Sequence, residues 1–114
     1  MPNMMTKKAS PTAWTKRIEW ATPMPPADGT GVVDRTGRLY DYTIVVTARP
    51  NAMWNDSMAM VYAHVDTPDG RRFHLPQQAI TGGWRRALSH GVDWARGLIG
   101  CDLKQTPPWV NQGG

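Results

Sequence analysis

The strongest hydrophobic period in the chain lies in Trp84–Ile99. At about 100° per residue, one side of a helix carries the apolar residues Trp84, Leu88, Gly91, Val92, Ala95, Leu98 and Ile99, with Ala87 and Trp94 at its edge. This arc spans roughly 160°, which is wide enough for a buried face. The opposite side carries the polar residues Arg85, Arg86, Ser89, His90, Asp93 and Arg96. The pattern predicts a helix that covers the core, with Thr81 as a candidate N-cap and Gly100 at the C-cap.

Strict alternation predicts a strand at Leu39–Ala48. β-branched and aromatic residues dominate it, and the expected core side carries Tyr40, Tyr42, Ile44, Val46 and Ala48. Upstream, Asp34-Arg35-Thr36-Gly37 has the composition of a tight turn, with Asp first and Gly last. We therefore expect a hairpin in which Val32-Val33 pairs with the start of this strand.

A second hairpin is predicted from Met58–Val65 and Arg71–Leu75. Between them, Pro68-Asp69-Gly70 fits a three-residue loop with Gly in the left-handed position. That loop sets a register with the cross-strand pairs Val65–Phe73, Ala63–Leu75, His64–His74 and Asp66–Arg72. The apolar pairs then share one face and the polar pairs the other, so the register is self-consistent.

The segment Trp14–Ala21 fits two structures. As a strand it places Lys16, Ile18 and Trp20 on one face, and as a helix it aligns Trp14, Ile18 and Ala21. Eight residues are few for a self-supporting helix, which favours an extended segment. Thr22–Gly31 is rich in Pro and Gly and is expected to be a loop.

Together these elements predict an α+β fold. An antiparallel sheet of four to five strands, built from two hairpins, packs on one C-terminal amphipathic helix. The 114 residues suit a single domain. We expect a flexible N-terminal leader at 1–12, the domain at 13–103 and an extended C-terminal tail at 104–114.

Composition and charge narrow the function classes. The net charge of +4 permits contact with nucleic acid, but the basic residues form no long run. Cys101 is the single cysteine, which excludes an intramolecular disulfide and a cysteine-rich zinc site. This favours a reducing, cytoplasmic location. No apolar stretch approaches the ~18 residues of a membrane span, so no membrane association is expected.

One weak candidate for a metal site is the set His64, Asp66 and His74. Two histidines and a carboxylate are the ligands of a class of non-haem iron sites, and the predicted register brings the histidines opposite each other. Arg72 faces Asp66 in the same register and would neutralise it. We therefore expect no metal and no other cofactor.

Catalytic motifs are lacking in the sequence. Cys101 and His90 form the one Cys/His combination, and the cysteine follows a helix C-terminus, where the dipole raises a thiol's pKa. Gly29-Thr30-Gly31 and Gly82-Gly83 match neither the Walker nor the dinucleotide pattern. We expect a protein that is not an enzyme.

Six tryptophans are many for a chain of this length. Four lie outside the firmly predicted elements and are candidate protein-binding residues, since exposed aromatics form interface hot spots: Trp14, Trp20, Trp54 and Trp109. The alternative is that they pack loose segments onto the domain. The leading hypothesis is a small stand-alone protein that binds a host protein or a protein–nucleic acid complex, as phage or mobile-element inhibitors of host defence or host enzymes do. A homodimer is left open.

The alternative hypothesis is a nucleic-acid-binding module. Its candidate residues are the arginines of the second hairpin and of the helix: Arg71, Arg72, Arg85, Arg86 and Arg96. The order of three strands and a helix that opens with Gly83-Trp84-Arg85-Arg86 resembles that of double-stranded RNA-binding domains, which implies phosphate contacts by Arg85 and Arg86. The likeness is one of element order over about residues 39–99, and the initial helix of that family is missing here.

Overall fold

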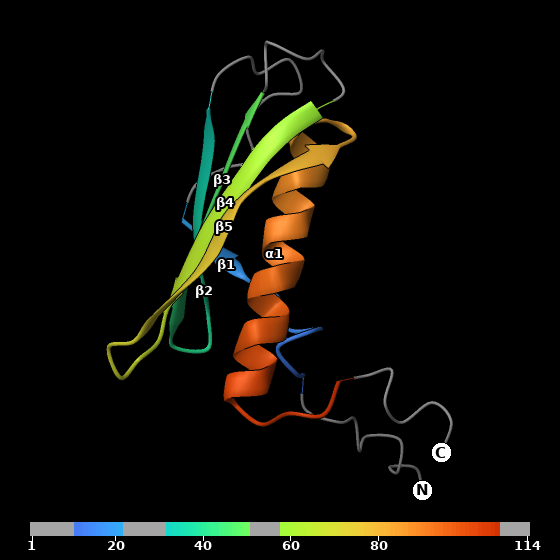
Figure 1. Cartoon of the computed structure of the whole chain (residues 1–114). Coiled ribbons are helices and arrows are strands. Elements are labelled where there is room, and N and C mark those ends of the chain that lie inside the picture. The colour runs from blue at the N-terminus through green and yellow to red at the C-terminus, as the bar shows by residue number, and fades with distance from the viewer. Residues whose placement is uncertain (1–10, 22–31, 51–57, 108–114) are drawn as a thin grey trace, which may run out of the picture.

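The computed structural model describes residues 11–21, 32–50 and 58–107. They form a five-stranded antiparallel sheet in which each strand pairs with the next one along the chain. The elements are β1 (Glu19–Trp20), β2 (Val33–Leu39), β3 (Tyr42–Pro50), β4 (Met58–Asp66), β5 (Arg72–Thr81) and α1 (Gly83–Asp102). Figure 1 shows α1 lying along one face of the curved sheet. This is the predicted α+β fold, with its single C-terminal helix.

The core lies between α1 and the alternating apolar positions of the sheet. On β3 the inward residues are Tyr42, Ile44, Val46 and Ala48, and on β4 they are Ala59, Val61, Ala63 and Val65, all of them buried. Period-2 alternation places these residues on one face because successive side chains of a strand point to opposite sides. The predicted core side of β3 is confirmed, except that Tyr40 lies in the turn before the strand.

The β4–β5 hairpin has the predicted register. Val65 pairs with Phe73, Ala63 with Leu75, His64 with His74 and Asp66 with Arg72. Gly70 has φ 91°, so the loop uses glycine in the left-handed region as expected. The sequence suggested that the second strand of this hairpin ends at Leu75, but β5 extends beyond that residue. The register shifts between Val61 and Ala63, and β5 continues through Pro76 to Thr81 because an edge strand tolerates a proline at such an irregularity.

The β2–β3 turn lies elsewhere than predicted. Asp34–Gly37 belongs to β2, and the chain turns at Tyr40-Asp41, since Leu39 pairs directly with Tyr42. Gly37 serves close packing here: a Cβ on it would lie 2.7 Å from Ile18 Cγ2 and 2.7 Å from the Trp20 ring. The turn prediction was wrong because a glycine required by packing has the same sequence appearance as a glycine required by a turn.

The helix extends beyond Trp84–Ile99, the segment in which the hydrophobic period was recognised. It begins at Gly83 and ends at Asp102, and its N-cap is Gly82 at φ 111° rather than Thr81, which lies in β5. Gly100 is not a cap. It lies buried inside the helix, where a Cβ would come within 2.3 Å of the Trp14 ring. Both predicted caps were therefore wrong, because Thr81 pairs with Met58 in the sheet and Gly100 makes room for the Trp14 ring inside the helix.

The N-terminal segment is fastened to the C-terminal half of α1. The Arg96 guanidinium donates hydrogen bonds to the carbonyl oxygens of Ala13 (2.9 Å) and Lys16 (2.7 Å). The Ala13 N–H donates to Gln105 Oε1 at 2.7 Å. This segment contains a turn and then the two-residue strand β1, so the extended alternative for Trp14–Ala21 is closer to the structure than the helical one.

Within the described ranges, no helix combines the length and the apolarity that crossing a lipid bilayer requires.

Candidate binding surface

One helix is too narrow to cover five strands. Neighbouring strands lie about 4.8 Å apart, so the sheet is roughly 20 Å wide, whereas a helix with its side chains is about 10–12 Å across. Accordingly α1 packs on β3, β4 and β5. The inner side of β2 lies beside the helix, and a pocket of about 300 Å³ opens there.

This pocket, called the Trp20 pocket below, combines apolar and charged side chains. The Arg35 side chain reaches into the molecule from β2, is 9% exposed, and has its Cζ 4.0 Å from the Trp20 ring centroid. Burial lowers the pKa of the Arg35 guanidinium. The helix completes the lining, which consists of Trp20, Arg35, Arg85, Leu88, Ser89, Val92 and Asp93.

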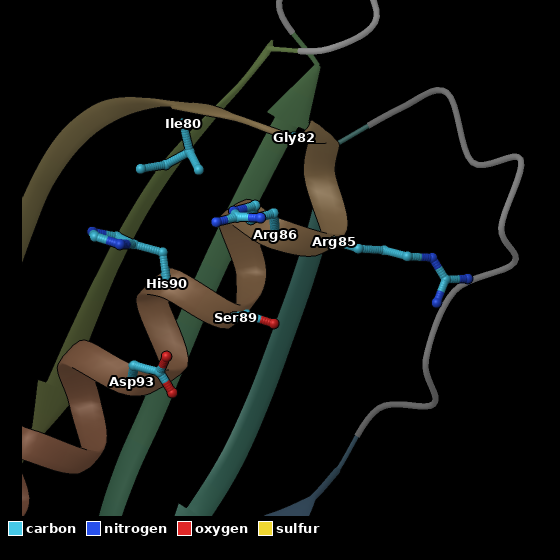
Figure 2. A pocket seen from close by; sticks show the side chains of 7 residues that line it. All are labelled: Ile80, Gly82, Arg85, Arg86, Ser89, His90 and Asp93. Carbon is cyan, nitrogen blue, oxygen red and sulfur yellow. The ribbon is translucent and has the colours of Figure 1, made fainter.

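A second, larger hollow lies over the start of the same helix. It has a volume of about 650 Å³ and is lined by Ile80, Gly82, Arg85, Arg86, Ser89, His90 and Asp93. Figure 2 shows Arg85 extending to one side of the helix and His90 to the other. The residues Arg85, Ser89 and Asp93 are four apart and form one row along the helix, and this row lines both hollows.

Positive charge dominates this surface. Among the lining residues of the two hollows, Arg35, Arg85 and Arg86 are cationic and Asp93 is the one acid. Arg85 and Arg86 are exposed, and neither forms an ion pair with any residue of the described ranges. The Arg85 guanidinium lies 4.8 Å from the Trp84 ring centroid. The surface therefore offers two guanidinium groups that have no ion-pair partner among the described residues, and one of them, Arg85, also lines the recess that contains the Trp20 indole.

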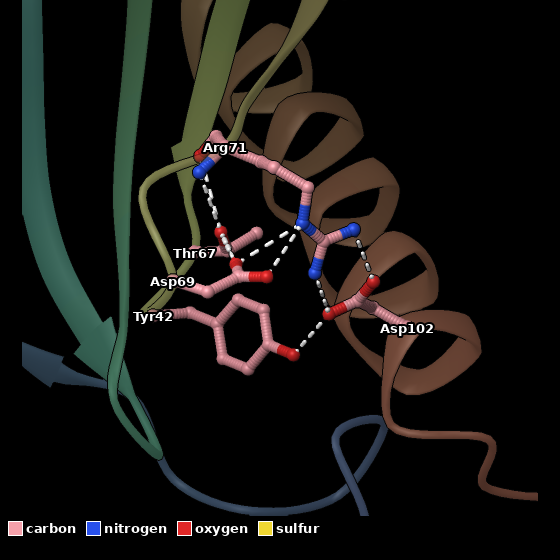
Figure 3. A network of polar contacts seen from close by, with 5 residues as sticks. All are labelled: Tyr42, Thr67, Asp69, Arg71 and Asp102. Atoms are coloured by element: carbon pink, nitrogen blue, oxygen red, sulfur yellow. Dashed lines mark hydrogen bonds and ion pairs between the residues drawn. The ribbon is translucent and has the colours of Figure 1, made fainter.

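Arg71, in contrast, is committed to a network at the other end of the helix. Its guanidinium donates to Asp102 Oδ1 at 3.0 Å and Oδ2 at 3.1 Å, and its Nε donates to Asp69 Oδ2 at 2.9 Å. The Tyr42 hydroxyl donates to the same Asp102 carboxylate (Figure 3). Hydrogen bonds from Arg71 and then from Tyr42 lower the pKa of Asp102. This network ties the β4–β5 loop and β3 to the end of α1.

Arg72 and Arg96 are also occupied. Arg72 makes a bidentate pair with Asp66, with distances of 2.5 Å and 3.0 Å. Arg96 holds the carbonyl oxygens of the N-terminal segment. Of the five arginines expected to contact nucleic acid, the structure thus brings only Arg85 and Arg86 together on an open surface.

The network at Asp102 predicts an unusual tyrosine titration. Burial, and after it the hydrogen bond to Asp102, raises the pKa of Tyr42 from 10.0 to about 12. The native state then keeps a proton that the unfolded chain loses, so this stability is present below about pH 10 and is lost as pH rises through about 12. Tyrosinate absorbance should show one late ionisation that Tyr42→Phe removes. A late ionisation that persists in Tyr42→Phe would contradict the assignment.

Of the four tryptophans proposed to bind protein, Trp14 and Trp20 lie within the described residues, and both are half-buried and packed. Trp14 lies against Gly100 and within 3.9 Å of the Cβ position of Gly97. Trp20 covers Gly37 and stacks on Arg35. Both therefore fasten the N-terminal segment to the domain, and Trp20 additionally lines a pocket. Trp54 and Trp109 lie outside the described residues.

The histidine pair and Asp66 do not form a metal centre in this arrangement. The His64 and His74 rings are 6.0 Å apart, and His64 Nε2 lies 3.8 Å from Asp66 Oδ2. The Arg72 guanidinium already occupies the Asp66 carboxylate and lowers its pKa. In the part of the chain that the structure describes, no group of three or more His, Cys, Asp or Glu residues could hold a metal ion.

Cys101 and His90 are not brought together. Both lie on α1, eleven residues apart, which corresponds to about 16 Å along the helix axis. Cys101 is exposed near the end of the helix. This pair has no geometry for nucleophilic catalysis.

Arg35, which is buried, is the residue of the Trp20 pocket that the misplaced turn concealed at the level of sequence. Its position was assigned to a turn, where an arginine is unremarkable. With β2 placed correctly, Arg35 pairs with Val46, a buried core residue, and therefore points inward. An arginine at an inward strand position is unusual enough to signal a site.

Comparisons of the chain with protein-family models, with curated proteins and with solved structures found no match.

Proposed function

We propose that this chain acts by binding a partner protein that presents an acidic surface, and that the N-terminal half of α1 is the binding surface. One observation carries the proposal: Arg85 and Arg86 form no ion pair with any described residue, and they line the hollows that flank the Arg85–Ser89–Asp93 row. Concave surfaces that pair an aromatic group with arginine suit protein recognition. A small accessory protein of a phage or mobile element that inhibits a host protein in the cytoplasm would act in this way.

The nucleic-acid alternative draws less support from the same residues. With Arg71, Arg72 and Arg96 engaged internally, Arg85 and Arg86 remain, which suffice for about two phosphate contacts. Two contacts correspond to a salt dependence of only about −1.8 in log K against log salt, typical of weak binding. The alternative is therefore kept as an outcome of the test.

The test reverses the charge of the proposed surface. The double variant Arg85→Glu, Arg86→Glu should reduce capture of the partner from a nuclease-treated host lysate by about tenfold or more, because rim charges control association. Acidic residues in the first turn favour the helix dipole, so the fold should persist. Bound protein, measured by quantitative mass spectrometry, is the readout.

The matched control is Arg38→Glu with Arg49→Glu, two exposed arginines of β2 and β3. Both double variants change the net charge by the same amount, from +4 to 0 (+4 − 4). Equal loss of capture in the two variants would show that only bulk charge matters. If the partner is captured from an untreated lysate but not from the nuclease-treated one, the surface binds nucleic acid instead.

A further inference from the structure

The Trp20 pocket combines charged groups with an apolar lining of Trp20, Leu88 and Val92, whereas Ile80 is the one large apolar side chain among the lining residues of the neighbouring hollow. The Trp20 pocket places two guanidinium groups, from Arg35 and Arg85, and one carboxylate, from Asp93, around a single recess. Two guanidinium groups among the lining residues suit an anionic ligand. A carboxylate also matches the planar, two-donor edge of a guanidinium. A phosphate dianion matches less well, because its second charge would face Asp93.

The Asp93 carboxylate places a second requirement on the ligand. An ionised carboxylate can only accept hydrogen bonds, so the ligand needs an N–H or O–H group near its own carboxylate. The Ser89 hydroxyl beside it in the row can donate or accept. The ligand therefore carries a donor and an anion close together.

The rest of the pocket is apolar and small. Trp20, Leu88 and Val92 form the apolar part of the lining. The volume of about 300 Å³ lies at the lower end for ligand pockets, which suits one residue-sized group rather than a passing chain.

We propose that the Trp20 pocket binds the C-terminal residue of the partner chain. Its carboxylate lies at Arg35 and Arg85, its backbone N–H donates to Asp93, and an aliphatic side chain packs on Trp20. The end of a chain carries these three groups on neighbouring atoms. The inference rests on the proposed function and states what the partner must present.

N-acetyl-leucine is the probe, because it reproduces such a chain end. It should shift the indole N–H resonance of Trp20, assigned with Trp20→Phe, in a saturable titration. N-acetyl-leucinamide, which lacks the charge, should bind roughly tenfold more weakly or worse. 4-Methylpentanoate, which lacks the amide N–H, should also bind more weakly. Equal affinity of the acid and the amide, or no saturable shift with the acid, would overturn the proposal.

Two variants test where the carboxylate of the ligand binds. Arg85→Gln, at an exposed position, should weaken the acid roughly tenfold and leave the amide unchanged. Arg35→Lys keeps the charge but loses the planar fork, and should also weaken the acid. Arg38→Gln is the control, because Arg38 lies on the outward side of β2, and it should leave the affinity for N-acetyl-leucine unchanged. If Arg35→Lys fails to fold, Arg85→Gln alone decides.

This titration uses the free protein and needs no partner. If N-acetyl-leucine fails to bind, the pocket assignment is wrong, while the charge-reversal experiment still decides the proposed function. If the probe binds as expected and charge reversal leaves capture intact, the proposed function is wrong instead. The two failures are therefore distinguishable.

Discussion

Replacing Ile99 by alanine should lower the free energy of unfolding by about 2–5 kcal/mol. Ile99 is fully buried in the last turns of α1 and is one of the largest side chains with no exposure. Truncation removes apolar surface from the core and leaves a cavity, and the close packing of the other buried side chains limits how far that cavity can collapse. Urea denaturation of the variant and the parent measures the difference.

Two further variants make this result specific. Ile99→Val removes one methyl group and should cost about 0.5–1.5 kcal/mol, in keeping with a graded packing effect. Val32→Ala removes apolar groups from a side chain that is 55% exposed, and should stay within about 0.5 kcal/mol of the parent. A loss from Ile99→Ala as small as that from Val32→Ala would contradict the position of the helix on the sheet.

The hydrophobic pattern was sufficient to predict the layers of the fold. Alternation in Leu39–Ala48 and Met58–Val65 identified the buried faces of β3 and β4, and the 3.6-residue period identified α1. The loop Pro68-Asp69-Gly70 fixed the β4–β5 register residue by residue. These signals are local or periodic, and tertiary contacts reinforced them instead of overriding them.

The glycines were the main source of error. Gly37 and Gly100 were read as a turn residue and a helix cap, yet each lies inside an element and faces a ring from the N-terminal segment. In both cases the reason for the glycine is a residue distant in sequence, Trp20 or Trp14. A pattern of single positions cannot express such a contact, so the β2 turn and the end of α1 were misplaced.

The candidate surface was predictable in part. Arg85 and Arg86 were selected from their place at the start of the helix, and they do line a hollow. Arg71 and Arg72 were selected on charge alone, although the register already placed Asp66 opposite Arg72. The Asp102 partner of Arg71 lies 31 residues away, so only the fold could reveal it. Arg35 was hidden by the misplaced turn.

The same change, glycine to alanine, should have opposite effects at Gly97 and Gly91 of α1. At Gly97 an added Cβ meets only the Trp14 Nε1 at 3.9 Å, an ordinary contact. Alanine there should raise the unfolding free energy by about 0.5–1 kcal/mol through helix propensity. At Gly91 the Cβ would lie 2.6 Å from Val46 Cγ1 and 3.3 Å from Val61 Cγ2.

Neither valine can yield easily at Gly91. Both are fully buried strand residues, and β-branched side chains have few alternative rotamers. The helix must therefore shift away from the sheet, and Gly91→Ala should lower the unfolding free energy by about 1–3 kcal/mol despite the gain in propensity. Thermal and urea unfolding of the two variants gives the comparison. If Gly91→Ala is as stabilising as Gly97→Ala, the close contact between α1 and the β3–β4 pair is wrong.

The same contact also fixes the distance between α1 and β2. A helix that shifts away from the sheet would therefore reshape the Trp20 pocket. The binding of N-acetyl-leucine should weaken in Gly91→Ala but not in Gly97→Ala.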